Sequence, residues 1–374
     1  MISIQPSNES PHTGRAGHAA PSPSGKDAPP GPARFFHGGS PQPCDEAQLA
    51  HWWDRAGLDH LGALIRTLLV QSIGLSQAHL QLKEAIDALE PPDDGVRARA
   101  RAMHLGIAAM AAFQMERVRT IARCARAYVD YLIVADRLRN LEGSIALQRI
   151  IVRKCREDAD ADREELSFAV SASIAEMHAA QERMRGSRDQ ALLVLCNELG
   201  EPVEATYRRV HGHALPEEPA QIPGTGTPEC LARRRPDLIG ALHGVCAAEL
   251  APPETASMQT PRARLAHEHA VASAENEVEC ALRALRARIS ELVPLRASTA
   301  AAETMAWKTR ESVNAGKLPN AALSGANFLL CARRDREIEV RGDSYLALIG
   351  LFEALGAGWE SGPFLQADAG DASA

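Results

Sequence analysis

Three aspartates at alternate positions give the pattern in this sequence that comes nearest to a metal site. Asp158, Asp160 and Asp162 match the first three ligand positions of an EF-hand calcium loop. That loop also needs a glycine at its sixth position and a bidentate glutamate at its twelfth, where this chain has Arg163 and Ala169. We therefore interpret the aspartates as a solvated turn between two helices, a role that aspartate fills well.

A histidine pair and an arginine triplet raise two further possibilities. His267 and His269 stand two residues apart, so on a helix they point to different faces and do not share one ion easily. The triplet Arg233–Arg235 suggests a nucleic-acid contact, but the chain carries a formal net charge of −7 and no concentrated basic stretch. We interpret the triplet as solvated arginines at the start of a helix, just before Pro236.

No other residue pattern points to catalysis. The 8 cysteines stand singly, without a C-x-x-C pair or zinc spacing, and fit small apolar positions of helices. No Ser/His/Asp or Cys/His arrangement, glycine-rich phosphate loop or paired carboxylate rises above chance. The sequence thus predicts a protein that is not an enzyme, with no cofactor, no metal and no nucleic-acid partner.

The elements that would position any site are helices. Hydrophobic residues make up 45% of the 374 positions and aromatic residues 4%, and an alphabet of Ala, Arg, Leu and Glu favours helices over strands. Apolar residues recur at steps of three and four in long stretches, expected over Val96–Cys155, Arg262–Val313 and Leu323–Leu355. No run of about 18 apolar residues occurs, and no strand pattern is visible. We predict an all-α fold.

The order of helices and breaks occurs twice. A helix, a Pro-Pro break, a long helix, a polar turn and a last helix end at Leu199-Gly200, and the same series ends at Leu355-Gly356. The predicted fold is two tandem repeats of long, coiled-coil-like helical hairpins in an elongated bundle. The predicted regions are a disordered segment 1–44, repeats 45–200 and 229–359, an extended proline-rich linker 201–228 and a flexible tail 360–374.

The second repeat carries specific text. The stretch Arg234–Ile239 reads R-R-P-D-L-I, Asn314–Asn320 reads N-A-G-K-L-P-N, and Tyr345–Trp359 ends in A-L-G-A-G-W. In this order they resemble the TolC family of outer-membrane efflux factors, in particular its NodT-like branch. In that family R-R-P-D opens the second repeat, an A-G turn follows the long helix, and A-L-G-G-G-W closes the chain. Here Ala357 replaces one glycine.

The first repeat agrees with this resemblance over roughly residues 45–359. His51–Leu61, with Trp52-Trp53, is similar to the start of the family's first helix, Ala125–Asp130 to its A-R-A-Y-V-E segment, and Leu195–Pro202 to the close of its first repeat. The tryptophan pair has two interpretations, an interfacial anchor or a staple that packs the N-terminal helix on the bundle. We prefer the staple.

The resemblance implies a passive tunnel component of an RND-type tripartite system. The family forms homotrimers in the outer membrane and periplasm, and the tunnel tip meets a periplasmic adaptor protein and an inner-membrane efflux pump. By resemblance the tip would be the turn with Gly316, Lys317, Leu318, Pro319 and Asn320. The alternative is a plain turn between two helices, which every helical hairpin needs.

The sequence departs from the family in three places. The two membrane-spanning β-hairpins expected within Glu84–Arg97 and Ala248–Arg262 have no room, because one strand needs about 9–11 residues. No signal peptide is visible, which leaves cytoplasmic retention open. Ala159 or Asp160 stands where the first turn should have glycine. We therefore expect a degenerate channel component, with a helical scaffold or a remnant without transport as the alternatives.

Overall fold

The computed structural model describes residues 34–38, 46–89, 95–157, 161–218 and 221–360. The chain divides into two units, Met1–Gly31 and Pro32–Ala374, and every residue described belongs to the second. Within that unit the secondary structure is helical, and the described ranges contain no β-strand. The all-α prediction is confirmed.

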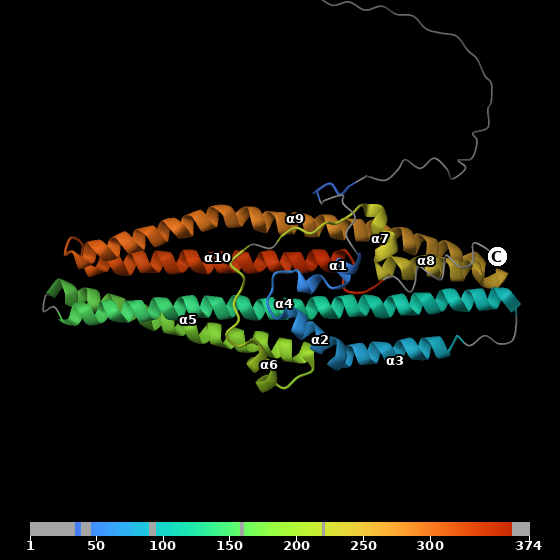
Figure 1. Ribbon diagram of the computed structural model, residues 1–374, viewed down its shortest axis with the longest axis horizontal. Coiled ribbons are helices and arrows are strands. Elements are labelled where there is room, and N and C mark those ends of the chain that lie inside the picture. Colours follow the sequence, from blue (N-terminus) through green and yellow to red (C-terminus); the bar gives the residue numbers. More distant parts are fainter. Residues whose placement is uncertain (1–33, 39–45, 90–94, 158–160, 219–220, 361–374) are drawn as a thin grey trace, which may run out of the picture. The chain divides into compact units, whose positions relative to one another are not determined.

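The helices follow one another as two related series (Figure 1). In chain order they are α1 Glu46–Ala50, the 3-10 helix η1 Trp52–Asp54, α2 Leu61–Gln71, α3 Ile73–Asp87, α4 Gly95–Glu157, α5 Ala161–Leu199, α6 Val203–Val210, α7 Pro228–Arg234, α8 Pro236–Glu249, α9 Pro253–Asn314 and α10 Asn320–Ala354. The series α3, α4, α5 corresponds to α8, α9, α10, so the duplication read from the sequence is present in the fold.

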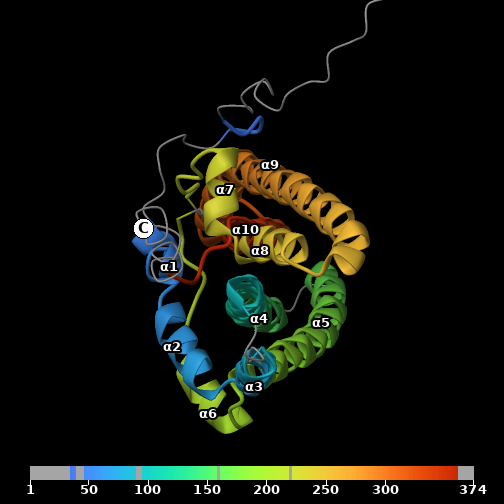
Figure 2. The ribbon, with the colours of Figure 1, turned by 90° about the vertical axis from the view of Figure 1, so that its right-hand side faces the viewer.

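Helix α4 lies at the centre of the unit. It has 63 residues, about 95 Å at 1.5 Å per residue, and packs against α3, α5, α8 and α10 (Figure 2). Helices α9 and α10 form the second hairpin, and α10 lies along α4. The contact between the two repeats is therefore made largely by α4 with α8 and α10.

The two repeats end in the same way. Gly200 and Gly356 have φ of 69° and 68°, in the left-handed region that favours glycine. The residue after each glycine donates its N–H to the last turn of the helix, Glu201 to Cys196 O at 3.2 Å and Ala357 to Phe352 O at 2.9 Å. Both repeats thus close with a Schellman-type turn, as the two Leu-Gly pairs predicted.

The tryptophan pair packs the N-terminal segment on the bundle. Trp52 and Trp53 are 2% and 3% exposed, and the Trp52 ring stacks on Phe352 of α10 with centroids 4.6 Å apart. Burial of two such large side chains contributes strongly to a helical core. The predicted staple is confirmed, and the interfacial anchor is excluded by this burial.

We predicted an extended proline-rich linker over residues 201–228. The structure differs, because this linker contains the helix α6. Val203–Val210 has no proline or glycine, and Pro202 before it has extended backbone angles that suit the start of a helix. Glu204 and Arg208 form an (i, i+4) ion pair at 3.0 Å, and Val210 is fully buried. Local apolar and charge spacing therefore overrides the overall composition here.

Helix α9 begins at Pro253, nine residues before the expected start at Arg262. Pro253 occupies the first turn, where its missing N–H costs nothing, and the helix continues through Pro261. Only Leu250–Pro252 separate α8 from α9, at the second expected hairpin position. The first such position includes residues 90–94, which lie outside the described residues.

Part of the segment expected to be disordered contacts α9. Phe35 is 2% exposed, and the backbone N–H groups of Phe36 and His37 both donate to the carboxylate of Glu279. The His37 ring also meets this carboxylate at 2.9 Å. Sequence composition did not anticipate this contact, because it depends on one carboxylate of a distant helix.

Candidate functional site

The predicted tip of the second hairpin is an exposed turn, residues 315–319, between α9 and α10. Gly316 has φ of 71°, and a methyl group placed on it would meet nothing within 4 Å. Its N–H donates to Val313 O at 3.0 Å, and the N–H of Lys317 donates to Ser312 O at 2.9 Å. The expected role of Gly316, to allow the tight turn, is therefore present in the structure.

The turn presents its side chains to solvent. Lys317 and Pro319 are exposed, and the apolar side chain of Leu318 keeps 43% of its surface accessible. Pro319 precedes the first residue of α10, Asn320, with φ of −72° and ψ of 157°. Because proline also restricts the backbone of the residue before it, Pro319 limits the conformations open to Leu318.

Buried contacts support the turn from below. Leu323 of α10 is 7% exposed and packs with Ile151 of α4, and Val313 of α9 joins them. One turn of helix further, Gln148 and Ser324 exchange two hydrogen bonds, Nε2 to Ser324 O at 3.2 Å and Oγ to Gln148 Oε1 at 2.9 Å. The end of α4 thus lies beside the turn. The corresponding first turn, with Asp158 and Asp160, falls outside the described residues.

A second exposed feature is an apolar stripe along α9. Met258, Leu265, Val293 and Trp307 are 80%, 68%, 70% and 62% exposed. Their positions differ by multiples of seven, which places them on one face of a helix in a coiled-coil packing. We call these four residues the α9 stripe. The same heptad positions between Leu265 and Val293 include Glu279 and Arg286, so the stripe is apolar only towards its two ends.

The arginine triplet is placed differently from our expectation. Arg233 is exposed, but Arg234 and Arg235 are 7% and 3% exposed, so the prediction of solvated arginines is wrong for both. Arg234 Nε donates to Leu355 O at 2.8 Å, and Arg235 pairs with Asp237 and Glu277, each at 2.7 Å. The closing turn of α10 lies on these guanidinium groups, which the sequence alone did not reveal.

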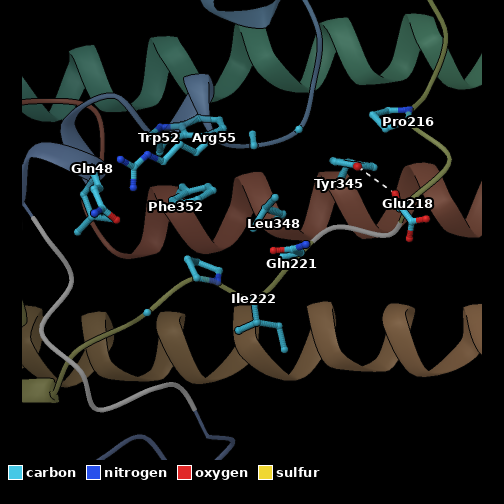
Figure 3. A pocket seen from close by; sticks show the side chains of 15 residues that line it. Gln48, Trp52, Arg55, Pro216, Glu218, Gln221, Ile222, Tyr345, Leu348 and Phe352 are labelled. Carbon is cyan, nitrogen blue, oxygen red and sulfur yellow. Dashed lines mark hydrogen bonds between the residues drawn. The ribbon is translucent and has the colours of Figure 1, made fainter.

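A pocket of about 380 Å³ lies between η1, α10 and the segment that follows α6 (Figure 3). Trp52, Leu348 and Phe352 form its apolar wall. Tyr345 of α10 donates its hydroxyl to Glu218 O of the linker at 3.0 Å (Figure 3).

A histidine cluster joins the segment after α6 to α4. The rings of His60 and His213 stack with centroids 3.9 Å apart, and the Tyr128 hydroxyl meets His213 Nδ1 at 2.9 Å. The same hydroxyl donates to Asp59 O at 2.9 Å, so His213 Nδ1 carries the proton toward Tyr128. Burial, followed by the neighbouring His60, lowers the pKa of His213 from its ordinary 6.5.

This cluster predicts a stability loss in mild acid. Because the folded pKa of His213 is below 6.5, the unfolded chain binds more protons as the pH falls through 6.5. The contribution of neutral His213 to the free energy of unfolding is therefore complete above pH 6.5 and decreases below it. The loss is less than about 1 kcal/mol, because water partly reaches the ring. His213→Asn should weaken this pH dependence of the urea midpoint. His269→Asn, at an exposed position, should leave it unchanged.

The remaining residues that the sequence singled out do not form a site. His267 and His269 both lie on α9, half-buried and exposed respectively. Across the described ranges, no group of three or more His, Cys, Asp or Glu side chains is placed to hold a metal ion. In the same part of the chain, no helix combines the length and apolarity needed to cross a membrane.

Solved structures show what this arrangement is similar to. The chain matches the outer-membrane channel OprN with a TM-score of 0.72 at 17% identity, over 85% of this chain and 95% of that one. It matches the Campylobacter jejuni outer membrane channel CmeC with a TM-score of 0.66 at 11% identity, over 88% and 96%. The open Neisseria gonorrhoeae channel MtrE gives 0.65 at 15%, over 81% and 90%.

No protein-family model and no curated protein matches the sequence. The structures it resembles are channels and not enzymes, and all are of the TolC type. The identities are low, so the likeness concerns the backbone arrangement. The described part of this chain therefore has the α-helical fold of the TolC-family outer-membrane channels.

Proposed function

We propose that this protein is the passive helical tunnel component of a tripartite RND-type efflux system. The observation that carries the proposal is the TolC-type fold together with the exposed turn at the end of α9 and α10. The turn is the adaptor-binding site, formed by Gly316, Lys317, Leu318, Pro319 and Asn320. Leu318 is its apolar anchor, because an accessible leucine on a rigid turn loses little conformational entropy on binding.

The proposal includes a homotrimer in the periplasm beside the outer membrane. The α9 stripe supports it, since its exposed apolar residues at heptad spacing suit a helix of a neighbouring copy. The proposed partners are a periplasmic adaptor protein and, through it, an inner-membrane pump.

We also propose that this chain is a shortened form of the channel. The three residues between α8 and α9 support this, because related channels would carry a membrane-spanning hairpin at this point. A helical scaffold without transport is the alternative, and it differs in requiring neither the trimer nor the adaptor.

The turn predicts a specific loss of adaptor binding. Leu318→Asp should weaken binding of a periplasmic adaptor from the same genome by at least about 30-fold, which equals about 2 kcal/mol for a central apolar anchor. Thermal stability should not change, because this side chain is largely outside the core. Binding is measured by biolayer interferometry on the full chain, and oligomeric state by sedimentation.

The matched control is Leu329→Asp, on α10 about 15 Å from the turn along the helix. Leu329 is 38% exposed and Leu318 is 43% exposed, so both variants change the same type of side chain at a similar exposure. Equal losses of adaptor binding in both variants would mean that the turn is not part of the interface. A monomer that captures no adaptor would contradict the tunnel proposal and favour the scaffold.

A further inference from the structure

A short segment near the N-terminus lies across the middle of α9. The backbone N–H groups of Phe36 and His37 donate to the carboxylate of Glu279, and the His37 ring meets the same carboxylate at 2.9 Å. Gly38 lies beside Arg286, since a methyl group on this glycine would be 2.7 Å from Arg286 Nη2. Glu279 and Arg286 are the charged positions in the line of heptad positions that carries the α9 stripe. The segment therefore covers the part of this line that is not apolar.

We call residues 35–38 the strap, and its backbone forms a closed turn. Gly38 N–H donates to Phe35 O at 3.1 Å, and Gly38 has φ of 71°. The buried side chain of Phe35 belongs to the main hydrophobic core, so it anchors the strap on the body. The rings of Phe36 and His37 meet edge to face with centroids 5.1 Å apart. A turn that is already fixed by these contacts loses little conformational entropy when a partner binds.

Phe36 places a large apolar side chain where the heptad line has none. It is 89% exposed, the largest exposed fraction among the large apolar side chains of the described residues. Its N–H bonds to Glu279, which is midway between Leu265 and Val293 and about 21 Å from each at 1.5 Å per residue. With Phe36 included, the line carries an exposed apolar side chain in its middle as well as towards its two ends.

This surface fits another long helix. From Met258 to Trp307 the heptad line extends over about 74 Å, and packing along it needs a helix of comparable length. This chain itself supplies such helices, since α5 has 39 residues and α9 has 62. The stripe residues and Phe36 expose roughly 500 Å² of apolar surface, more than half of the ~800 Å² that each partner buries in a standard interface. A second copy of this chain is therefore the occupant that the surface fits.

We propose that the strap is part of the surface through which copies of this chain associate, with Phe36 as the central apolar contact between α9 and the neighbouring copy. This inference rests on the homotrimer of the proposed function and adds the segment that completes its interface. Glu279 acts by holding the strap in place. A strap that shields α9 from a second copy would have the opposite effect on association, so the direction of the change decides between the two roles.

The test is sedimentation equilibrium of the full chain and its variants over a range of protein concentrations. Phe36→Ala should raise the concentration at which half of the chain is trimeric by at least about tenfold, because a central aromatic contact is lost from every interface. Phe36→Leu keeps an apolar side chain and should retain most of the affinity. Neither variant should change the thermal stability of the monomer, since this side chain is 89% exposed.

Two variants on α9 separate the strap from the stripe. Glu279→Ala removes the acceptor of the two backbone N–H groups, so the strap should no longer hold Phe36 on the line and association should weaken as in Phe36→Ala. Trp307→Ala removes an exposed stripe residue that is remote from the strap. It should weaken association whether or not the strap takes part, and so it reports on the trimer alone.

Unchanged association in Phe36→Ala would overturn the inference, and the trimer would stand if Trp307→Ala still weakened it. Tighter association in Glu279→Ala would also overturn it, because the strap would then be a cover that keeps copies apart. A wild-type chain that stays monomeric at every concentration would contradict both this inference and the homotrimer. Adaptor binding by the turn at Leu318 is measured separately and does not depend on any of these results.

Discussion

Replacing Arg235 by methionine should lower the free energy of unfolding by about 3 kcal/mol, the low end of the range for breaking a buried ion pair. The guanidinium is 3% exposed and donates to Glu277 Oε2 at 2.7 Å, to Asp237 Oδ2 at 2.7 Å and to Ala354 O at 3.0 Å. Methionine fills much of the volume but leaves these acceptors without a donor. The low end applies because the Glu277 carboxylate stays half-exposed and water can reach it.

The effect is large because Arg235 connects three helices of the second repeat. It precedes α8, binds Glu277 of α9 and holds the last turn of α10 through Ala354 O. Gly356 lies against the same residue, since a methyl group there would be 3.0 Å from Arg235 Cα. Loss of the side chain thus loosens the end of α10 as well as the start of α8.

The neighbouring Arg233 gives the control. Arg233→Met changes the same side chain two residues earlier at an exposed position, and should alter stability by no more than about 0.5 kcal/mol. Urea unfolding followed by far-UV circular dichroism measures both variants. Equal midpoints for the two would mean that Arg235 contributes no more than a solvated arginine.

Arg234 and Arg235 also mark the limit of what the sequence could predict. Helices such as α4 and α10 follow from apolar spacing that each segment carries by itself, and Gly200, Gly316 and Gly356 are recognisable from their place after that spacing ends. A buried arginine needs carboxylates and carbonyls from other helices. Its own neighbours in sequence look the same whether it is buried or solvated.

The candidate sites divide in the same way. The turn with Gly316 and Leu318 was predictable, because a hairpin between two long helices has to turn where the pattern breaks. The contact that supports it was not, since Gln148 and Ser324 belong to different repeats and meet only after α10 packs on α4. The stacked pair of His60 and His213 likewise joins segments that no local spacing relates.

Replacing Gly342 by alanine should destabilise the protein by about 1–2 kcal/mol, although alanine normally stabilises a helix. Gly342 lies in α10 where it passes α4, and an added methyl group would be less than 3.0 Å from Cγ1 and Cδ1 of Ile133. Ile133 is 8% exposed, so it has little room to move. The overpacking cost of about 1–3 kcal/mol therefore exceeds the helix gain of about 0.5–1 kcal/mol.

Two further variants decide whether this contact sets the spacing of the two repeats. Gly325→Ala on the same helix meets nothing within 4 Å, so it should stabilise by about 0.5–1 kcal/mol, opposite in sign to Gly342→Ala. In a double-mutant cycle with Ile133→Ala, the loss should be smaller than the sum of the single losses by about 0.5–3 kcal/mol, because the new methyl group enters the space that isoleucine leaves. Additive losses would mean that Ile133 turns aside. The close approach of α10 to α4, on which the contact between the repeats depends, would then rest on other residues.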